Sequence, residues 1–304
     1  MIPIVRRLGW SLAVLVGVSL LTFCLAFLIP SDPAVTLAGP KADAETLASI
    51  RHSMGLDRPV LVQYVAYVGR LLKGDLGRSY LTRQEVSSAI GERLPATAIL
   101  AAASLGLATV VGVLLACWSA LRQRSRVDVA VLVASLVALS IPVFWTGMLL
   151  LYVFAYRLRV LPLGGFGVAN LVLPACALAL GTSGYYTRLL HTNLRAVLNA
   201  DYVRTARAKG LGPLRVYGKH ALRNALIPLI TVIGLDFAAF MGGVVLTETV
   251  FNWPGLGRLA VQALFDQDIP MIMGTVLFSA VAVIAVNLVV DLLYVVVDPR
   301  IRYQ

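Results

Sequence analysis

The sequence predicts an all-α polytopic membrane protein, with six transmembrane helices and a small extracytoplasmic helical cap between helices 1 and 2. Of the 304 residues, 59% are hydrophobic and 13% are charged, and the mean hydropathy is +0.84, outside the range of soluble domains. Six apolar stretches reach the roughly 20 residues that a helix needs to cross a bilayer. Each must be helical, because lipid offers the backbone no hydrogen-bond partner.

The six stretches leave little of the chain for a separate soluble domain. They run over Gly9–Ile29, Thr97–Ala120, Val129–Tyr156, Leu171–Leu190, Ile227–Val250 and Met271–Val297. We therefore divide the chain into the N-terminus and first transmembrane helix at 1–29, the extracytoplasmic cap at 30–95, and a core of five transmembrane helices at 96–304. The core includes a basic loop at 188–226.

Basic residues gather at alternate connections between the stretches. The N-terminus carries Arg6 and Arg7, and the loop from Arg188 to Arg223 carries eight of the 26 basic residues against one acid, Asp201. Because basic loops beside membrane spans stay cytoplasmic, we expect both termini and this loop on the cytoplasmic side. The net charge of +11 is then mostly a sign of topology, and nucleic acid is not an expected partner.

The segment 30–95 shows the residue pattern of ordered helices. Asp43 is suited to cap a helix that ends at Gly55, and after Pro59 apolar residues recur at helical spacing. The recurring apolar residues are Leu61, Tyr64, Val65, Val68 and Leu72. We interpret the segment as a cap over the outer mouth, the alternative being a spacer.

The basic loop is typical of two short amphipathic helices. Apolar residues interleave with its charges, and the run from Gly210 to Pro213 interrupts it, since Gly and Pro break helical backbone. Two short exposed helices of this kind are suited to bind another protein. The alternative is a positively charged loop that lies on anionic lipid headgroups.

Residue patterns of enzymes are missing. The chain lacks the G-x-x-x-x-G-K-[ST] phosphate loop and H-E-x-x-H, and its three cysteines have no paired spacing, so we expect no catalytic residue, no metal and no bound cofactor. His191 and His220 fall in the basic loop, where we expect them to face solvent or headgroups. The chain is expected to be a non-catalytic membrane subunit.

Two acids lie within the fifth stretch, where a charge at the bilayer centre costs about 2.5–3.5 kcal/mol on insertion scales. Asp236 sits well inside the stretch and Glu248 near its outer end. Asp236 either lines a translocation pathway or makes a helix–helix hydrogen bond. Glu248 either lies at the interface or lines the outer mouth.

Several motifs, in order along essentially the whole chain, resemble the permease subunits of ABC importers. Asp201–Gly210 followed by His220–Pro228 resembles the coupling loop of that family, and more narrowly of its dipeptide, oligopeptide, nickel and glutathione branch. The general family pattern has Glu-Ala-Ala before the glycine, whereas this chain has Arg204-Thr205-Ala206. The peptide branch departs from the general pattern in a similar way. The other motifs are Leu56–Pro59, Gly74–Ser79, Thr247–Phe251, Trp253–Gly257 and Asp298–Tyr303.

The resemblance implies a permease of a bacterial or archaeal inner (plasma) membrane that moves peptides by alternating access. It implies a second homologous permease subunit in a heterodimer, two cytoplasmic ATPase subunits that bind ATP and Mg, and an extracytoplasmic solute-binding protein. The ATPase-coupling residues would be Asp201, Tyr202, Arg204, Thr205, Ala206, Ala208, Lys209, Gly210, Leu211, Tyr217, His220, Leu222 and Arg223. Nickel or glutathione as cargo, or an ion-coupled carrier that works without ATPases, are the alternatives.

Overall fold

A computed structural model describes residues 2–28, 33–39, 42–123 and 125–297 of the chain. The motif Asp298–Tyr303, with Arg300 and Arg302, lies outside the described residues. The regular elements among them are all helices, and the described residues also contain one isolated antiparallel bridge, between Arg78 and Glu85. The chain divides into two compact units, Met1–Thr97 with Gly242–Val245 and Pro254–Ile284, and Ala98–Met241 with Leu246–Trp253 and Ala285–Gln304.

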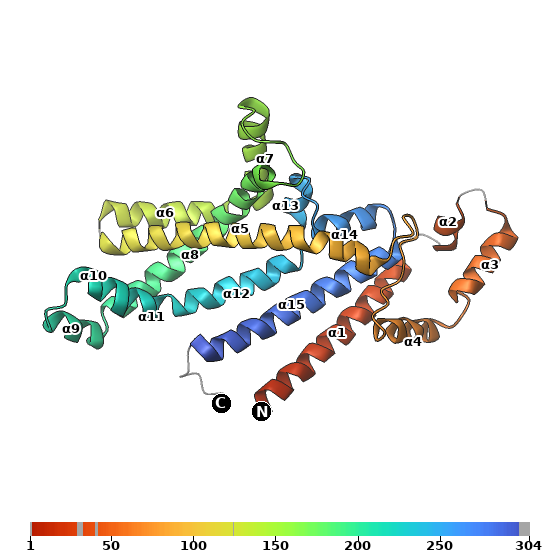
Figure 1. The fold of residues 1–304 in the computed structure, drawn as a ribbon, viewed down its shortest axis with the longest axis horizontal. Helices are drawn as coiled ribbons and strands as arrows, with labels where there is room; N and C mark the ends of the chain where they lie inside the picture. The colour runs from red at the N-terminus through yellow and green to blue at the C-terminus, as the bar shows by residue number, and fades with distance from the viewer. Residues whose placement is uncertain (1, 29–32, 40–41, 124, 298–304) are drawn as a thin grey trace. The chain divides into compact units, whose positions relative to one another are not determined.

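Figure 1 shows the order of the helices along the chain. They are α1 (Ile2–Leu28), α2 (Pro33–Ala38), α3 (Ala44–Met54), α4 (Val60–Leu71), α5 (Val86–Leu121), α6 (Arg126–Ser140), α7 (Val143–Leu150), the π-helical η1 (Leu151–Arg157), α8 (Val168–Leu198), α9 (Asp201–Ala208), α10 (Pro213–Arg215), the π-helical η2 (Val216–Leu222), α11 (Arg223–Ala225), α12 (Ile227–Met241), α13 (Val245–Val250), α14 (Leu256–Phe265) and α15 (Ile269–Val297).

Three to five membrane spans are supported by the length and composition of the described helices. Val86–Leu121, Val168–Leu198 and Ile269–Val290 are each long and apolar enough alone, and two bent pairs of helices qualify if each is one span. The sequence predicts six transmembrane helices, and the described part of the structure supports an all-helical protein with three to five candidate spans. In α1 the described apolar stretch is shorter, Gly9–Cys24.

The predicted third span, Val129–Tyr156, is not one continuous helix. The chain bends by 95° between α6 and the helix that begins at Val143. Ile141 and Pro142 leave helical geometry, with ψ angles of 124° and 134°. Proline has no N–H for the helical ladder and biases the residue before it toward extended backbone, so the break falls there.

The predicted fifth span, Ile227–Val250, is also interrupted, near its C-terminal end. Helix α12 stops at Met241, and Gly243 takes a left-handed φ of +101° before α13 begins. A Cβ on Gly243 would lie 2.9 Å from the backbone N of Gly257. Glycine is therefore required at this corner both for its φ angle and for the close backbone contact.

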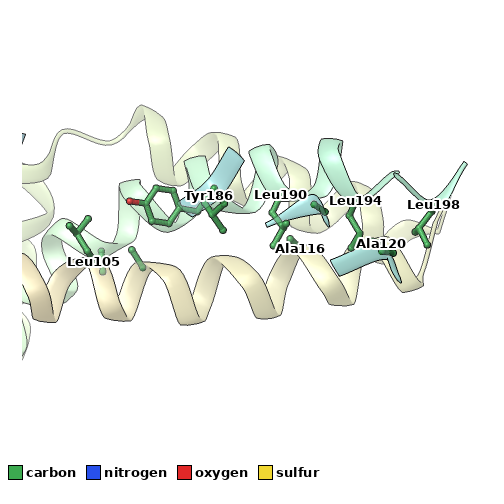
Figure 2. Packing of buried hydrophobic residues seen from close by; sticks show 12 residues of the cluster. Leu105, Ala116, Ala120, Tyr186, Leu190, Leu194 and Leu198 are labelled. Carbon is green, nitrogen blue, oxygen red and sulfur yellow. The ribbon is translucent and has the colours of Figure 1, made fainter. Parts of the chain in front are cut away.

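The core of the second unit lies along α8 (Figure 2). Tyr186, Leu190, Leu194 and Leu198 recur every fourth residue, which places them on one face of α8, and they pack against Leu105, Ala116 and Ala120 of α5. Helices α5 and α8 approach closely, since a Cβ on Gly112 would lie 2.8 Å from Tyr186 Cβ. A Cβ on Gly184 would lie 2.6 Å from the Ser135 carbonyl oxygen of α6.

In the first unit, the predicted capped helix is confirmed. Asp43 Oδ1 accepts a 3.2 Å hydrogen bond from the Thr46 amide at the start of α3. Hydrogen bonding to the Thr46 side chain and to this amide lowers the pKa of Asp43. Helix α3 ends at Gly55, whose φ is +67°. His52 Nδ1 lies 2.7 Å from Asp57 Oδ2, a contact that lowers the pKa of Asp57.

Candidate coupling loop and intramembrane polar pairs

The basic loop folds as two short helical segments, as the sequence predicts. Helix α9 covers Asp201–Ala208, and the chain resumes helical structure at Pro213, where α10 leads into η2. Pro213 occupies the first helical position, where its missing N–H costs no hydrogen bond. We refer below to Asp201–Arg223 as the coupling loop.

Gly210 forms the corner between the two segments. Its φ is +75°, a left-handed conformation that costs L-residues with a Cβ roughly 1–2 kcal/mol. The Gly210 amide donates to the Arg207 carbonyl at 2.9 Å, and the Leu211 amide donates to the Ala206 carbonyl at 3.3 Å, so the end of α9 is capped. No atom lies within 4 Å of a Cβ built on Gly210, so the requirement for glycine is one of backbone conformation and not of space.

The coupling loop has a small apolar core of its own. Val203 and Ala206 of α9 are buried against Val216 of η2, with Leu211 and Val197 partly buried around them. Ala206 therefore packs inside the loop, whereas Ala208 is exposed. A loop with an internal apolar core has a defined shape, unlike a flexible linker.

Polar contacts tie the two segments together. The amide nitrogen of Asn224 donates to the Tyr202 hydroxyl and to the His220 carbonyl, both at 3.0 Å. The Tyr202 hydroxyl in turn donates to the His220 carbonyl at 3.4 Å. The His220 ring is only partly buried, and Thr205 donates to the Asp201 carbonyl at 3.0 Å.

The second segment continues into the core of the second unit. Ala221 of η2, Ala225 of α11 and Leu229 of α12 are buried in the same cluster as Leu190 and Leu194 of α8. Tyr217 and Leu222 pack at the edge of that cluster. The coupling loop is thus joined by tight packing both to the end of α8 and to the beginning of α12.

The outward surface of the coupling loop is basic and carries one large apolar side chain. Leu214 is 92% exposed and Tyr202 is 44% exposed. The exposed basic residues are Arg204, Arg207, Lys209, Arg215, Lys219 and Arg223. Asp201 and Arg204 form an ion pair of 3.5 Å between side chains that are 96% and 74% exposed, so the pair contributes little stability.

Asp236 makes a hydrogen bond between helices. Its Oδ2 accepts from the Tyr186 hydroxyl of α8 at 2.7 Å. Tyr186 is fully buried, whereas Asp236 is only partly buried, so the carboxylate lies at the edge of the packed core. Tyr186 was not among the residues singled out in the sequence, because its partner lies 50 residues away.

Glu248 is completely buried in α13. Its backbone carbonyl accepts a 2.8 Å hydrogen bond from the Trp253 amide, and the Trp253 side chain is 1% exposed beside the ring of Phe166, at a centroid distance of 5.2 Å. The Glu248 side chain is therefore enclosed by the packing of the second unit.

His191 does not face solvent or headgroups, contrary to the expectation from the sequence. It lies in α8, is 3% exposed, and its Nε2 is 2.9 Å from Asp128 Oδ1 of α6. The Ser119 hydroxyl of α5 donates to the same oxygen at 2.5 Å. The mistake has a physical cause: α8 continues to Leu198, so the helical core extends two turns beyond the predicted end at Leu190.

This Ser–Asp–His cluster does not have the arrangement of a hydrolytic triad. In a triad the histidine lies between the nucleophile and the carboxylate, whereas here the carboxylate of Asp128 is central and holds both other groups. The cluster joins α5, α6 and α8. In the described part of the chain, no group of three or more His, Cys, Asp or Glu side chains is placed to hold a metal ion.

The motif Gly74–Ser79 is held by Asp268, a residue that the sequence pattern did not single out. The Ser79 hydroxyl and the Tyr80 amide both donate to the buried carboxylate of Asp268, the latter at 3.2 Å. Burial raises the pKa of Tyr80 to about 12. Leu256, from the motif Trp253–Gly257, is held in the first unit, where its amide donates to Thr97 Oγ1 at 2.8 Å.

Two family profiles together match almost the whole chain. Residues 108–303 match the family described as "Binding-protein-dependent transport system inner membrane component", and residues 1–101 match the N-terminal region of the corresponding membrane components. The first match alone covers more than half of the 304 residues, so it shows the family.

Curated relatives match over their full length. The oligopeptide transport system permease protein AppB of Bacillus subtilis (strain 168) is 39% identical over 312 residues, which cover 99% of each chain. The di/tripeptide transport system permease protein DppB of Pseudomonas aeruginosa (strain UCBPP-PA14) is 39% identical over 331 residues, covering 99% of this chain and 98% of the relative. The chain belongs to the inner membrane components of binding-protein-dependent transport systems, and is thus a multi-pass, non-catalytic permease subunit of an ABC transporter.

Proposed function

We propose that this chain forms half of the translocation pathway of an ATP-driven importer of peptides. Two relatives support peptides as the cargo. Both are 39% identical over their full length, and one is named for oligopeptides and the other for di- and tripeptides. Nickel and glutathione are the competing cargoes within the same class of importer.

The family implies a solute-binding protein and ATPase partners. We propose that the other half of the pathway is a second, homologous permease subunit and that two ATPase subunits serve the heterodimer. The chain would cross the membrane six times, with α1 as the first span and with the two bent helix pairs as the third and fifth. Its termini would be cytoplasmic and the segment 30–95 extracytoplasmic, which the distribution of basic residues supports.

The coupling loop is the proposed contact with an ATPase, and its fold is the observation that carries the proposal. It combines an internal core at Val203, Ala206 and Val216 with a basic outward surface around the exposed Leu214. A loop that merely lay on headgroups would need no such core. The shape suits a complementary groove with an acidic rim and an apolar floor.

The packing supports a mechanical route from the loop into the membrane. Because the same cluster holds Ala221 and Leu229 against α8, displacement of the loop would move α8 and α12 together. Those two helices carry Tyr186 and Asp236. We propose that Asp236 borders the pathway, since a partly exposed carboxylate facing lipid would be costly. Glu248 is buried, and a pathway role for it would require α13 to open.

The proposal can be tested on the complete transporter, reconstituted with its ATPases and binding protein. Leu214→Glu should release the ATPases in co-purification and abolish ATP-dependent uptake. Ser49→Glu, an exposed change on α3 of the first unit, is the control that should retain both. If Leu214→Glu keeps full ATPase association and uptake, the coupling loop is not the contact.

The cargo can be tested separately with the partner binding protein. Titration calorimetry with dipeptides, longer peptides, glutathione and nickel should give binding for peptides alone. Tight binding of nickel or glutathione with no peptide binding would overturn the cargo and leave the importer class intact.

A further inference from the structure

Helix α4 buries one apolar face against the first unit. Tyr67 is 7% exposed and lies in a cluster with Phe23 of α1 and Met273 of α15, and Tyr64 and Leu71 pack against the same cluster. The ring centroids of Phe23 are 5.2 Å from Tyr64 and 5.9 Å from Tyr67. This face of α4 is therefore covered by protein.

A second apolar face adjoins the first and is uncovered. The apolar stripe predicted in the sequence is divided in the structure, because Tyr64 and Val68 point inward while other members are exposed. Leu61, Val62, Val65 and Leu72 are 74%, 45%, 63% and 85% exposed. At about 100° per residue, these four side chains fall within an arc of about 100° on the helix.

The third face of α4 is polar or small. It carries Gln63, Ala66 and Arg70, with Lys73 in the turn just after the helix, and Gln63 donates to the Leu56 and Arg58 carbonyls at 3.2 and 2.8 Å. The helix thus presents a protein-covered face, an uncovered apolar face and a polar face. Division into an apolar and a basic polar side is typical of helices that lie in a membrane interface.

The contacts of α4 place it at the level of membrane-embedded residues. The Tyr64 hydroxyl lies 2.9 Å from Ser19 Oγ, and Ser19 is nine residues before the end of α1 at Leu28, a distance of about 14 Å along a helix. At the same level of α1, Leu20 and Leu21 are 48% and 60% exposed. Met273 lies in the first turns of the candidate span Ile269–Val290.

We propose that α4 lies in the bilayer interface and binds phospholipid. Leu61, Val62, Val65 and Leu72 contact acyl chains, and the basic side chains of Arg70 and Lys73 reach headgroup phosphates. The occupant is lipid because the uncovered face lies beside the exposed apolar surface of α1. This inference needs only that α1 and α15 lie in the bilayer, so it does not depend on the cargo or on the ATPases.

Spin labels report the environment of α4 directly. The complete transporter would be reconstituted in vesicles of phosphatidylethanolamine and phosphatidylglycerol, with Cys24, Cys117 and Cys176 replaced by serine. Labels would be attached at Leu61→Cys and Val65→Cys, with Ala66→Cys for the polar face. Ser49→Cys, exposed on α3, is the matched control for water. Collision rates with oxygen and with a water-soluble nickel chelate would be measured at each site.

The expected result is a several-fold higher ratio of oxygen to nickel collisions at positions 61 and 65 than at 66 and 49. Positions 61 and 65 as open to nickel as position 49 would show that the face is in water, and would overturn the proposal. Protection from both reagents would also overturn it, since the face would then be covered by a partner protein. Unchanged elution of the assembled transporter on size exclusion shows that the labelled variants fold.

Discussion

The hydroxyl of Tyr186 donates a 2.7 Å hydrogen bond to Asp236, which joins α8 to α12 within the second unit. Hydrogen bonds between transmembrane helices average about 0.6 kcal/mol and reach about 1.7 kcal/mol. Tyr186→Phe should therefore lower the free energy of unfolding in detergent by about 1 kcal/mol. Tyr185→Phe, whose ring is 42% exposed, is the control and should leave it unchanged. Equal stability of the Tyr186→Phe protein would show that the bond contributes nothing.

The charge of Asp236 can be separated from its hydrogen bond. Asp236→Asn keeps an oxygen that accepts from Tyr186, so the thermal stability should be nearly unchanged. If the carboxylate borders the pathway, uptake of peptides with a free amino terminus should fall by about tenfold, the effect of about 1.4 kcal/mol. Uptake at the rate of the unaltered protein would restrict Asp236 to a packing role.

Gly210 tests whether the shape of the coupling loop matters. Gly210→Val forces a β-branched residue to a φ of +75°, which should cost about 1–2 kcal/mol and reduce uptake per ATP hydrolysed. Gly210→Asn is the matched control, because asparagine tolerates the left-handed region and no atom lies near the new Cβ. A loss of coupling in both variants, or in neither, would contradict the conformational explanation.

The cluster around Asp128 should be important for stability. Ser119→Ala leaves a buried carboxylate oxygen with one fewer donor, at a cost of about 1–3 kcal/mol. His191→Ala should cost at least as much, since it also opens a cavity among buried side chains. Thermal unfolding of the purified subunit measures both, with His220→Ala as the partly exposed control. Stability equal to that of the control would show that the cluster is not a structural tie.

Tyr80 should make the free energy of unfolding depend on pH in the alkaline range. Its pKa in the folded protein is about 12, because burial disfavours the phenolate, whereas the pKa of an unfolded tyrosine is about 10. The contribution of Tyr80 is then fully present below pH 10 and is lost as the pH rises from about 10 to about 12. Tyr80→Phe should remove this part of the slope in a titration of unfolding against pH. The same slope in both proteins would contradict the shift.

Local features of the fold were predictable from the sequence. The capped start of α3 at Asp43, its end at Gly55 and the break at Gly210 each depend on residues a few positions apart. The apolar periods also located α5, α8 and α15. Their ends were less predictable, since α8 runs on to Leu198 through a segment whose charges indicated a loop.

Features that depend on distant residues were not predictable. Asp128 and His191 are 63 positions apart, and Ser79 and Asp268 are 189 positions apart. Nothing in the local pattern says that these side chains meet. The 95° bend after Ser140 was missed for another reason, because a proline in an apolar run is compatible with either a kinked span or a broken one.

The glycines at positions 112 and 184 mark two sides of α8 that are closed by tight packing. At Gly112 the helix meets α5, and at Gly184 it meets α6, with room for hydrogen atoms but not for a methyl group. Helix contacts that leave no space for one added carbon atom leave none for a peptide. The packed sides of α8 also include the one that meets α12, so the surface that this helix leaves open is the one carrying Leu180, Tyr185 and Arg188.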